Sequence, residues 1–265
     1  MMIQTDLILD QQPLIQATRV TRLYGINKGC QQIDLELYAG EVLGIVGESG
    51  SGKSTLLRCL AGIEPIDSGI VDYESTTGPK SLHDLAESER RRLIRQEWGF
   101  IQQNPRDGLH LEMSAGANIG ERLMAQGERH YGKIRQQALD WMQRVELDPA
   151  RIDDKPKTFS GGMQQRLQIA RNLVSGPRLL FMDEPTGGLD VSVQARVLDL
   201  IRKLVRELNV AVVLVTHDIG VARILADRLI VMRDSRIIET GLTDQILEDP
   251  QAPYTQLLVS SILRV

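Results

Sequence analysis

Gly47-Glu48-Ser49-Gly50-Ser51-Gly52-Lys53-Ser54 is a glycine-rich loop of the form G-x-x-x-x-G-K-[S/T]. Its glycines permit a tight turn, so that successive backbone N–H groups point at phosphate oxygens. The apolar run Val42–Val46 precedes the loop as a buried strand, and Lys53–Leu60 follows it as a helix whose positive N-terminal end favours an anion. A chance match to four fixed positions in a chain of this length has a probability of about one per cent. The loop therefore predicts an α/β fold that binds a phosphorylated ligand.

Two sets of side chains are expected to bind the phosphates and their metal ion and to activate the attacking water. Lys53 is predicted to reach the β- and γ-phosphates, and Ser54 is predicted to ligate Mg²⁺. A second buried strand, residues 179–182, runs into Asp183 and Glu184. Asp183 is expected to hold Mg²⁺ directly or through water, and Glu184 to orient and help deprotonate an attacking water. Alone, such a pair is an ordinary polar strand end, and the phosphate loop upstream is what favours the catalytic interpretation.

A third motif, Ser160-Gly161-Gly162-Met163, opens a helix predicted over residues 163–174. A Ser-Gly-Gly turn at a helix start offers unpaired N–H groups, a hydroxyl and the positive end of the helix dipole, which together bind anions. The phosphates of a single ATP are already surrounded by the first loop. A second device of this kind has a role if it caps a nucleotide held by another subunit.

In this order, and across nearly the whole chain, these motifs resemble the ABC (ATP-binding cassette) ATPase family. The resemblance implies a head-to-tail homodimer that binds and hydrolyses two ATP molecules with Mg²⁺. It also implies four further site residues. Tyr24 matches the aromatic residue that stacks on adenine, with an ordinary core aromatic as the alternative, and Gln103 matches the residue that senses the γ-phosphate and Mg²⁺. Asp190 matches the loop that crosses the dimer interface, and His217 matches the histidine that contacts the γ-phosphate.

Two details qualify the match. Gln102 adjoins Gln103, and Gln103 is preferred because it lies two residues before Pro105. Met163 departs from the commonest signature, which has Gln there, but Ser160 and Gly162 are retained. The expected catalytic residues are Glu184, His217, Gln103 and Lys53. The expected nucleotide-binding residues are Tyr24, Gly47, Glu48, Ser49, Gly50, Ser51, Gly52, Lys53, Ser54, Thr55, Ser160, Gly161, Gly162 and Asp190. The expected metal ligands are Ser54, Gln103 and Asp183.

The expected fold is a P-loop ABC ATPase with a mixed-sheet core, an N-terminal antiparallel β subdomain and an inserted helical subdomain. The chain is predicted to form one domain over residues 1–265. Its catalytic core is placed at 1–110 and 159–240, its helical subdomain at 111–158 and its C-terminal helical tail at 241–265. A charged helix is expected over residues 81–98, with Ser81 and Asp84 at capping-box spacing. Strands are expected at 14–20, 33–37, 42–46, 179–183 and 210–216, and a hairpin at 229–239.

Composition excludes several other classes of protein. The 265 residues carry a formal net charge of −4, which argues against a nucleic-acid footprint, and the run Arg90-Arg91-Arg92 is interpreted as a solvated helix face. Two cysteines, Cys30 and Cys59, exclude a disulfide scaffold and a four-cysteine metal site. The sequence has no secretory signal and no apolar run of membrane-spanning length, which predicts a cytoplasmic protein that acts at a membrane only through a partner.

Peripheral stretches bear on what ATP hydrolysis drives. Residues 249–258 and 187–195 resemble ATPases of oligopeptide, dipeptide and nickel importers. Residues 98–135 are similar to the ATPases of the carbon–phosphorus lyase pathway of phosphonate breakdown, which implies core subunits of that lyase as partners. An importer ATPase docked on membrane subunits is the alternative. A translation-type ABC protein is disfavoured, because such proteins usually carry two cassettes and this chain has one phosphate loop.

Overall fold

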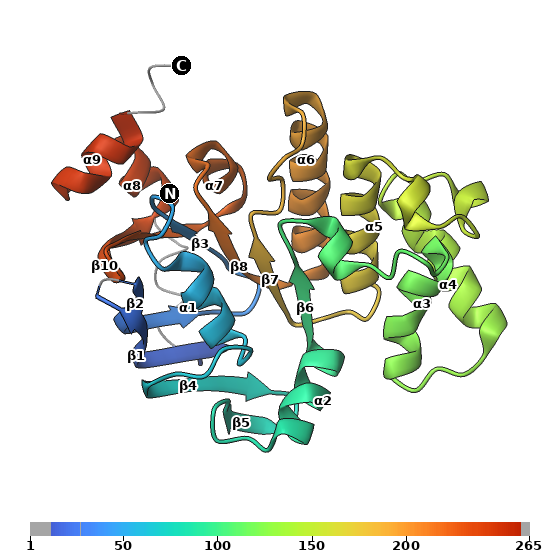
Figure 1. The fold of residues 1–265 in the computed structure, drawn as a ribbon, viewed down its shortest axis with the longest axis horizontal. Helices are drawn as coiled ribbons and strands as arrows, with labels where there is room; N and C mark the ends of the chain where they lie inside the picture. The colour runs from blue at the N-terminus through green and yellow to red at the C-terminus, as the bar shows by residue number, and fades with distance from the viewer. Residues whose placement is uncertain (1–11, 27, 261–265) are drawn as a thin grey trace.

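A computed structural model describes residues 12–26 and 28–260 of the chain. Two sheets and a helical region make up the molecule (Figure 1). The larger sheet has the strand order β10-β9-β3-β8-β7-β6; β9, β3, β8, β7 and β6 are parallel, and β10 is antiparallel to β9. Its strands are β3 (Val42–Val46), β6 (Trp98–Ile101), β7 (Leu179–Asp183), β8 (Ala211–Thr216), β9 (Arg228–Arg233) and β10 (Arg236–Leu242).

The smaller sheet is antiparallel throughout and has the order β2-β1-β4-β5. Its strands are β1 (Ile15–Gly25), β2 (Lys28–Leu37), β4 (Ser68–Ser75) and β5 (Gly78–Ser81). The expected combination of a mixed-sheet core with an N-terminal antiparallel unit is therefore confirmed. This sheet packs its apolar face on helix α1 (Lys53–Leu60), whose own apolar residues share one buried cluster with the strands.

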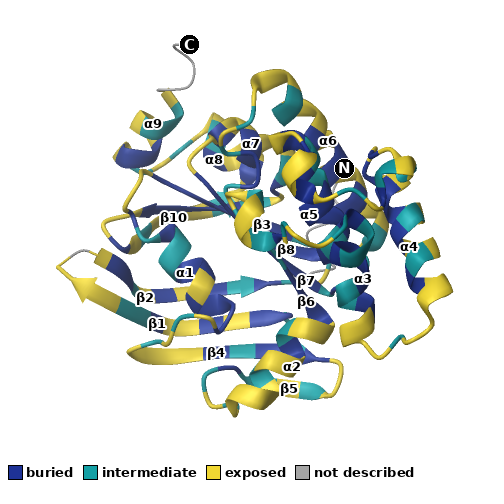
Figure 2. Cartoon of the chain, turned by 45° about the vertical axis from the view of Figure 1, so that its right-hand side comes forward, coloured by how far each residue is buried: buried dark blue, intermediate teal, exposed yellow. Residues whose placement is uncertain are grey.

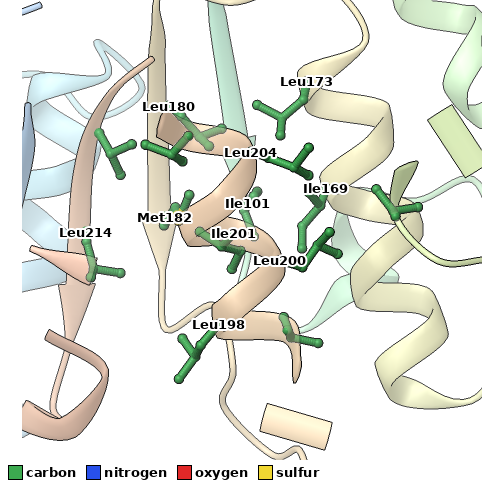
Figure 3. Close-up of a cluster of buried hydrophobic side chains, with 14 of the residues drawn as sticks. Ile101, Ile169, Leu173, Leu180, Met182, Leu198, Leu200, Ile201, Leu204 and Leu214 are labelled. Atoms are coloured by element: carbon green, nitrogen blue, oxygen red, sulfur yellow. The ribbon is translucent and has the colours of Figure 1, made fainter. Parts of the chain in front are cut away.

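The central strands are apolar without interruption because both faces of the larger sheet are covered. Leu43 and Ile45 of β3 face α1 and the antiparallel sheet, whereas the alternate residues Val42 and Val46 face the opposite cluster. That second cluster fills the space between the sheet and two helices, α5 (Gly161–Leu173) and α6 (Val191–Leu208). Figure 3 shows strand residues such as Leu180 pointing toward the side chains of these helices. The central strands β3 and β8 are buried along their length, whereas β1 and β4 of the smaller sheet have long exposed stretches (Figure 2).

Residues 111–158 contain α3 (Ala115–Ala125), α4 (Tyr131–Arg144) and the short 3₁₀ helices η2 (Pro149–Arg151) and η3 (Pro156–Thr158). They lie on the far side of α5 from α6 in Figure 1. The remaining helices are α2 (Glu87–Glu97), η1 (Pro105–Gly108), α7 (Ile219–Leu225), α8 (Thr243–Glu248) and α9 (Pro253–Ser260). No helix in residues 12–26 and 28–260 is long and apolar enough to cross a bilayer. The division of the chain into core, helical subdomain and tail stays a prediction.

The expected start of the charged helix at Ser81 is wrong. Ser81 pairs with Asp72 as the last residue of β5, and the next residue, Leu82, is fully buried and donates its N–H to the carbonyl of Val71. The helix begins only at Glu87, after Ala86, which has no capping side chain. Burial of Leu82 and pairing with β4 therefore outweigh the capping pattern. The helix also ends before Trp98, which starts β6.

The first two residues of the expected tail, 241 and 242, end β10, and the rest of its described part holds two helices, α8 and α9, on the side of the molecule that holds β10 (Figure 1). Pro250 separates them, since a proline cannot continue a hydrogen-bonded helix. The last five residues of the expected tail, 261–265, lie outside the described residues, as do residues 1–11 and 27.

Candidate functional site

The phosphate loop links β3 to α1, and its shape requires glycine for steric reasons. Gly47, Gly50 and Gly52 have φ values of +148°, +83° and +103°. A Cβ on Gly52 would lie 1.8 Å from the carbonyl oxygen of Gly29, and a Cβ on Gly47 would lie 2.2 Å from that of Met232. Backbone carbonyl groups of β2 and β9 therefore lie so close to the loop that only glycine fits at these two positions.

Lys53 is the first residue of α1 and is 6% exposed. Its Nζ donates to the carbonyl oxygens of Gly47 and Glu48, both at 2.8 Å, so the ammonium group lies across the loop. Burial lowers the pKa of Lys53, and the nearby carboxylates of Glu184 and Asp183 oppose that shift. The Lys53 ammonium group therefore binds two carbonyl oxygens of the loop, in a position where phosphate oxygens could replace them as acceptors.

Ser54 and Asp183 meet at the carboxyl edge of the parallel sheet, where β7 ends beside the start of α1. The Ser54 hydroxyl donates to Asp183 Oδ1 at 3.0 Å. Burial raises the pKa of Asp183, while the hydrogen bond from Ser54 lowers it. Hydroxyl and carboxylate oxygens are ligands that suit Mg²⁺, which takes one or two carboxylates together with phosphates rather than an all-protein cage. Within the described part of the chain, no group of three or more His, Cys, Asp or Glu side chains could hold a metal ion.

Glu184 is held by three donors from the end of the neighbouring strand. Its Oε1 accepts from the backbone N–H of His217 at 2.9 Å and lies 2.6 Å from His217 Nδ1, and its Oε2 accepts from the Thr216 hydroxyl at 3.1 Å. Its backbone N–H donates to Val215 O at 2.9 Å, and its φ is +48°. A left-handed conformation is uncommon for a residue with a side chain and marks strain that the surrounding contacts maintain. The carboxylate is therefore fixed in position beside a largely exposed imidazole.

These groups line one cavity of about 870 Å³. It is bounded by Tyr24, Lys28, Gly29, Gly47, Glu48, Ser49, Gly50, Gly52, Lys53, Ser54, Thr55, Gln103, Asp183, Glu184, His217 and Leu258. The structure thus brings together every site residue that the same chain was expected to contribute to its own nucleotide, except Ser51, which is buried within the loop. Sequence reasoning missed Lys28, Gly29 and Leu258, because no local motif marks them and only the packing of β2 and α9 beside the loop places them here.

Tyr24 lies at the rim of this cavity and is 55% exposed, so it is not a core aromatic residue. The guanidinium carbon of Arg22 lies 5.0 Å from the centre of its ring, a cation–π distance. Arg22 is in turn fixed by Asp67 at 2.8 Å and Glu64 at 3.0 Å. The open side of the ring is a platform of the kind that stacks on a planar base.

The Ser-Gly-Gly motif lies away from the cavity of its own chain. Figure 1 shows β7 and β8 between α1 and α5. Ser160 caps α5, and its Oγ accepts from Met163 N at 3.4 Å; Ser160, Gly161 and Asp190 are all exposed. Gly162 is buried, and a Cβ there would lie 2.5 Å from Val193 Cγ1, so this glycine is also needed for α5 to pack on α6.

Two glutamines on α5 connect this motif to the segments that carry the cavity residues. Gln165 Nε2 donates to Pro185 O at 2.7 Å, directly after Glu184. The side-chain amide of Gln168, oriented to pair with the backbone of Gln102, donates to the carbonyl oxygen of Gln102 and accepts from its N–H, both at 3.2 Å. Both glutamines are buried. Sequence reasoning did not assign them, because their partners are far away along the chain.

Comparisons with known proteins agree with this geometry. The family model described as ABC transporter matches residues 30–187. The phosphonates utilization ATP-binding protein PhnK of Escherichia coli K12 is 60% identical over 253 residues, covering 96% of this chain and 99% of that protein. The dipeptide transport ATP-binding protein DppF of the same strain is 37% identical, covering 96% and 78%. Among solved structures, the dimeric ATP-binding cassette MJ0796 bound to ADP and phosphate is similar with a TM-score of 0.76 and 30% identity, covering 86% of this chain and 98% of that one.

Proposed function

This chain belongs to the ABC transporter family of ATP-hydrolysing proteins, and from that premise we propose that it binds ATP with Mg²⁺ in the 870 Å³ cavity as a head-to-tail homodimer. One observation carries the assignment of the site. The phosphate loop with Lys53, the Ser54–Asp183 pair and the Glu184–His217 pair all face the same cavity. At its rim, Tyr24 stacks on the adenine.

The phosphates are held mainly by the backbone. The N–H groups of the loop and the end of α1 bind their oxygens, and Lys53 reaches the β- and γ-phosphates. Ser54, Asp183 and Gln103 hold the Mg²⁺, which neutralises phosphate charge when bound. Burial raises the pKa of Asp183, and a bound cation beside the carboxylate would favour its ionised form.

Hydrolysis is attack of a water oxygen on the γ-phosphorus, in line with the bond to the β-phosphate oxygen that breaks. Glu184 orients this water and accepts its proton. Because Thr216 and His217 hold the carboxylate, little reorganisation is needed during the reaction. His217 supports Glu184 through Nδ1 and directs its other ring nitrogen to the γ-phosphate.

The second half of each site comes from the partner protomer. Ser160, Gly161 and Gly162 cap the γ-phosphate of the opposite chain, and Asp190 crosses the interface. Their distance from the cavity of their own chain and the exposure of three of the four support this arrangement. Loss of the bridging γ-phosphate opens the dimer, so each turnover produces a movement.

We further propose that this movement serves phosphonate breakdown in the cytoplasm, within a carbon–phosphorus lyase complex whose core subunits are the partners. The identity of 60% to a phosphonates utilization protein over nearly the full length of both chains supports this. The identity of 37% to a dipeptide transport ATPase supports the alternative, an importer ATPase docked on membrane subunits.

Affinity purification of the full chain from its native host distinguishes these two functions. The Glu184→Gln variant with ATP and Mg²⁺ is the preferred bait, because a closed dimer is expected to persist without turnover. Lyase subunits among the captured proteins are the expected result, with Lys53→Ala as a control that cannot reach the closed state. Capture of integral membrane permeases alone would replace the lyase proposal with the importer.

A further inference from the structure

The C-terminal helix α9 lies against the phosphate loop, although about 200 residues separate them in sequence. The two residues just before it are fixed to β10, since both carboxylate oxygens of Glu239 accept their backbone N–H groups. Gln251 donates to Oε1 at 2.8 Å and Ala252 to Oε2 at 3.0 Å. The helix therefore has a defined position relative to the sheet that carries the loop.

Tyr254, in the first turn of α9, makes a polar contact with the loop itself. Its hydroxyl oxygen accepts from the backbone N–H of Glu48 at 3.1 Å. The side chain is buried at 7% exposure, and the guanidinium carbon of Arg233 lies 4.8 Å from the centre of its ring. Glu48 also supplies one of the two carbonyls that bind Lys53. One peptide segment of the loop is thus held by α9 on one side and by the phosphate-binding lysine on the other.

Leu258 follows Tyr254 by four residues and so lies on the same face of α9. It lines the 870 Å³ cavity together with the loop, Lys53 and Tyr24. Its neighbour Leu257 points away from this face and is 69% exposed. The helix therefore presents the Tyr254 hydroxyl to the backbone of the loop and the Leu258 side chain to the cavity.

The β9–β10 hairpin supports the same loop from an adjacent direction. The N–H of Ser235, in the turn of the hairpin, donates to the carbonyl of Ser51 at 3.1 Å. The carbonyl of Met232 also faces Gly47 closely. Two C-terminal elements that α8 separates in sequence, the hairpin and α9, thus both contact the phosphate loop.

We propose that α9 is a wall of the nucleotide site, with Tyr254 as a positioning residue for the phosphate loop and Leu258 as an apolar contact for the bound nucleotide. This inference rests on the proposed use of the cavity for ATP. Tyr254 acts on the nucleotide only through the Gly47–Glu48 peptide group, whose N–H it accepts and whose carbonyl, that of Gly47, accepts from Lys53. A displacement of α9 is therefore expected to move the loop and to change its affinity for ATP.

Two variants of the full chain test the proposal, with ATP and Mg²⁺ as the probe. Tyr254→Phe removes the acceptor and keeps the ring, and we expect the KM for ATP to rise about 3- to 10-fold with kcat nearly unchanged, as for loss of one hydrogen bond. Leu258→Ala is expected to weaken equilibrium ATP binding by about 3-fold or more through lost apolar contact. The matched controls are Tyr131→Phe and Leu257→Ala, at positions that are 72% and 69% exposed.

The outcomes separate this inference from the proposed function. Wild-type affinity in Tyr254→Phe and Leu258→Ala, with binding lost in Lys53→Ala, would overturn the role of α9 alone. A lower melting temperature of the nucleotide-free variants without a change in KM would also overturn it, because α9 would then only stabilise the fold. If Lys53→Ala binds ATP as well as the wild type, the proposed use of the cavity is wrong instead.

Discussion

Replacement of Glu184 by Gln changes one atom at the point where the attacking water is expected to bind. The structure indicates that the fold tolerates this change. The amide oxygen can keep the N–H of His217, and the amide nitrogen can donate to the Thr216 hydroxyl, which already accepts from Asp218 N at 3.0 Å. The cost is one rearranged hydrogen bond, about 1 kcal/mol, which corresponds to about 2–4 °C in Tm for a chain of this size.

Turnover should fall far more than stability. A general base contributes about 10²- to 10⁴-fold to rate, or about 3–5 kcal/mol of transition-state stabilisation at 1.36 kcal/mol per tenfold. Lys53, Ser54 and the loop are untouched, so ATP affinity is expected to stay near the wild-type value. Because the γ-phosphate persists, the variant should accumulate as a dimer in the presence of ATP and Mg²⁺.

The assay combines phosphate release at saturating ATP with equilibrium binding and the dimer fraction by size-exclusion chromatography. Glu97→Gln is the matched control, since Glu97 is another buried carboxylate that accepts hydrogen bonds, from Tyr73 and Thr76, outside the cavity. It should retain turnover. Phosphate release by Glu184→Gln within about tenfold of the wild type, with binding intact, would refute the role of Glu184 as the base.

Three further changes test other parts of the site. Lys53→Ala removes a charged donor and should weaken equilibrium ATP binding by about 10- to 100-fold; unchanged affinity would contradict the phosphate contact. Gly162→Ala places a Cβ 2.5 Å from Val193 Cγ1 and should cost about 1–3 kcal/mol in urea unfolding, and added Val193→Ala should relieve it; a stabilised single variant would show that the packing is not tight. Asp183→Asn removes a carboxylate whose pKa is raised by burial, so its ionisation opposes folding above that pKa. The Tm of the nucleotide-free variant should exceed that of the wild type at pH 7, and the gain should disappear as the pH falls toward 3.8; a gain that is independent of pH would exclude this cause.

The sequence predicted the parts of the site that depend on local backbone chemistry. The phosphate loop needs glycine where φ is positive and a lysine at the helix start, so it can be recognised from its residue types in the sequence. Asp183 and Glu184 were recognised as an acidic strand end, and the phosphate loop upstream favoured their catalytic interpretation. The same reasoning placed β3, α1 and β7 with the bounds that the structure has.

Short polar strands could not be predicted from sequence patterns. β5, Gly78–Ser81, has no apolar pattern and exists because β4 provides the complementary hydrogen-bonding edge. Leu82, buried just after it, moved the start of the next helix away from Ser81. Local propensity is a weak guide where pairing with a distant strand determines the conformation.

A phosphate-binding α/β core with an acidic strand end and a separate anion-binding turn could be predicted from the amino-acid sequence alone. Each of these is specified by residues within a few positions of one another, because helix ends, tight turns and strand ends are local features. Two features depend on the folded chain: Thr216 and His217 hold the Glu184 carboxylate, and α9 places Tyr254 on the phosphate loop and Leu258 at the cavity. Those contacts join segments far apart in the chain, and it is the packing of the two buried cores that brings them within bonding distance.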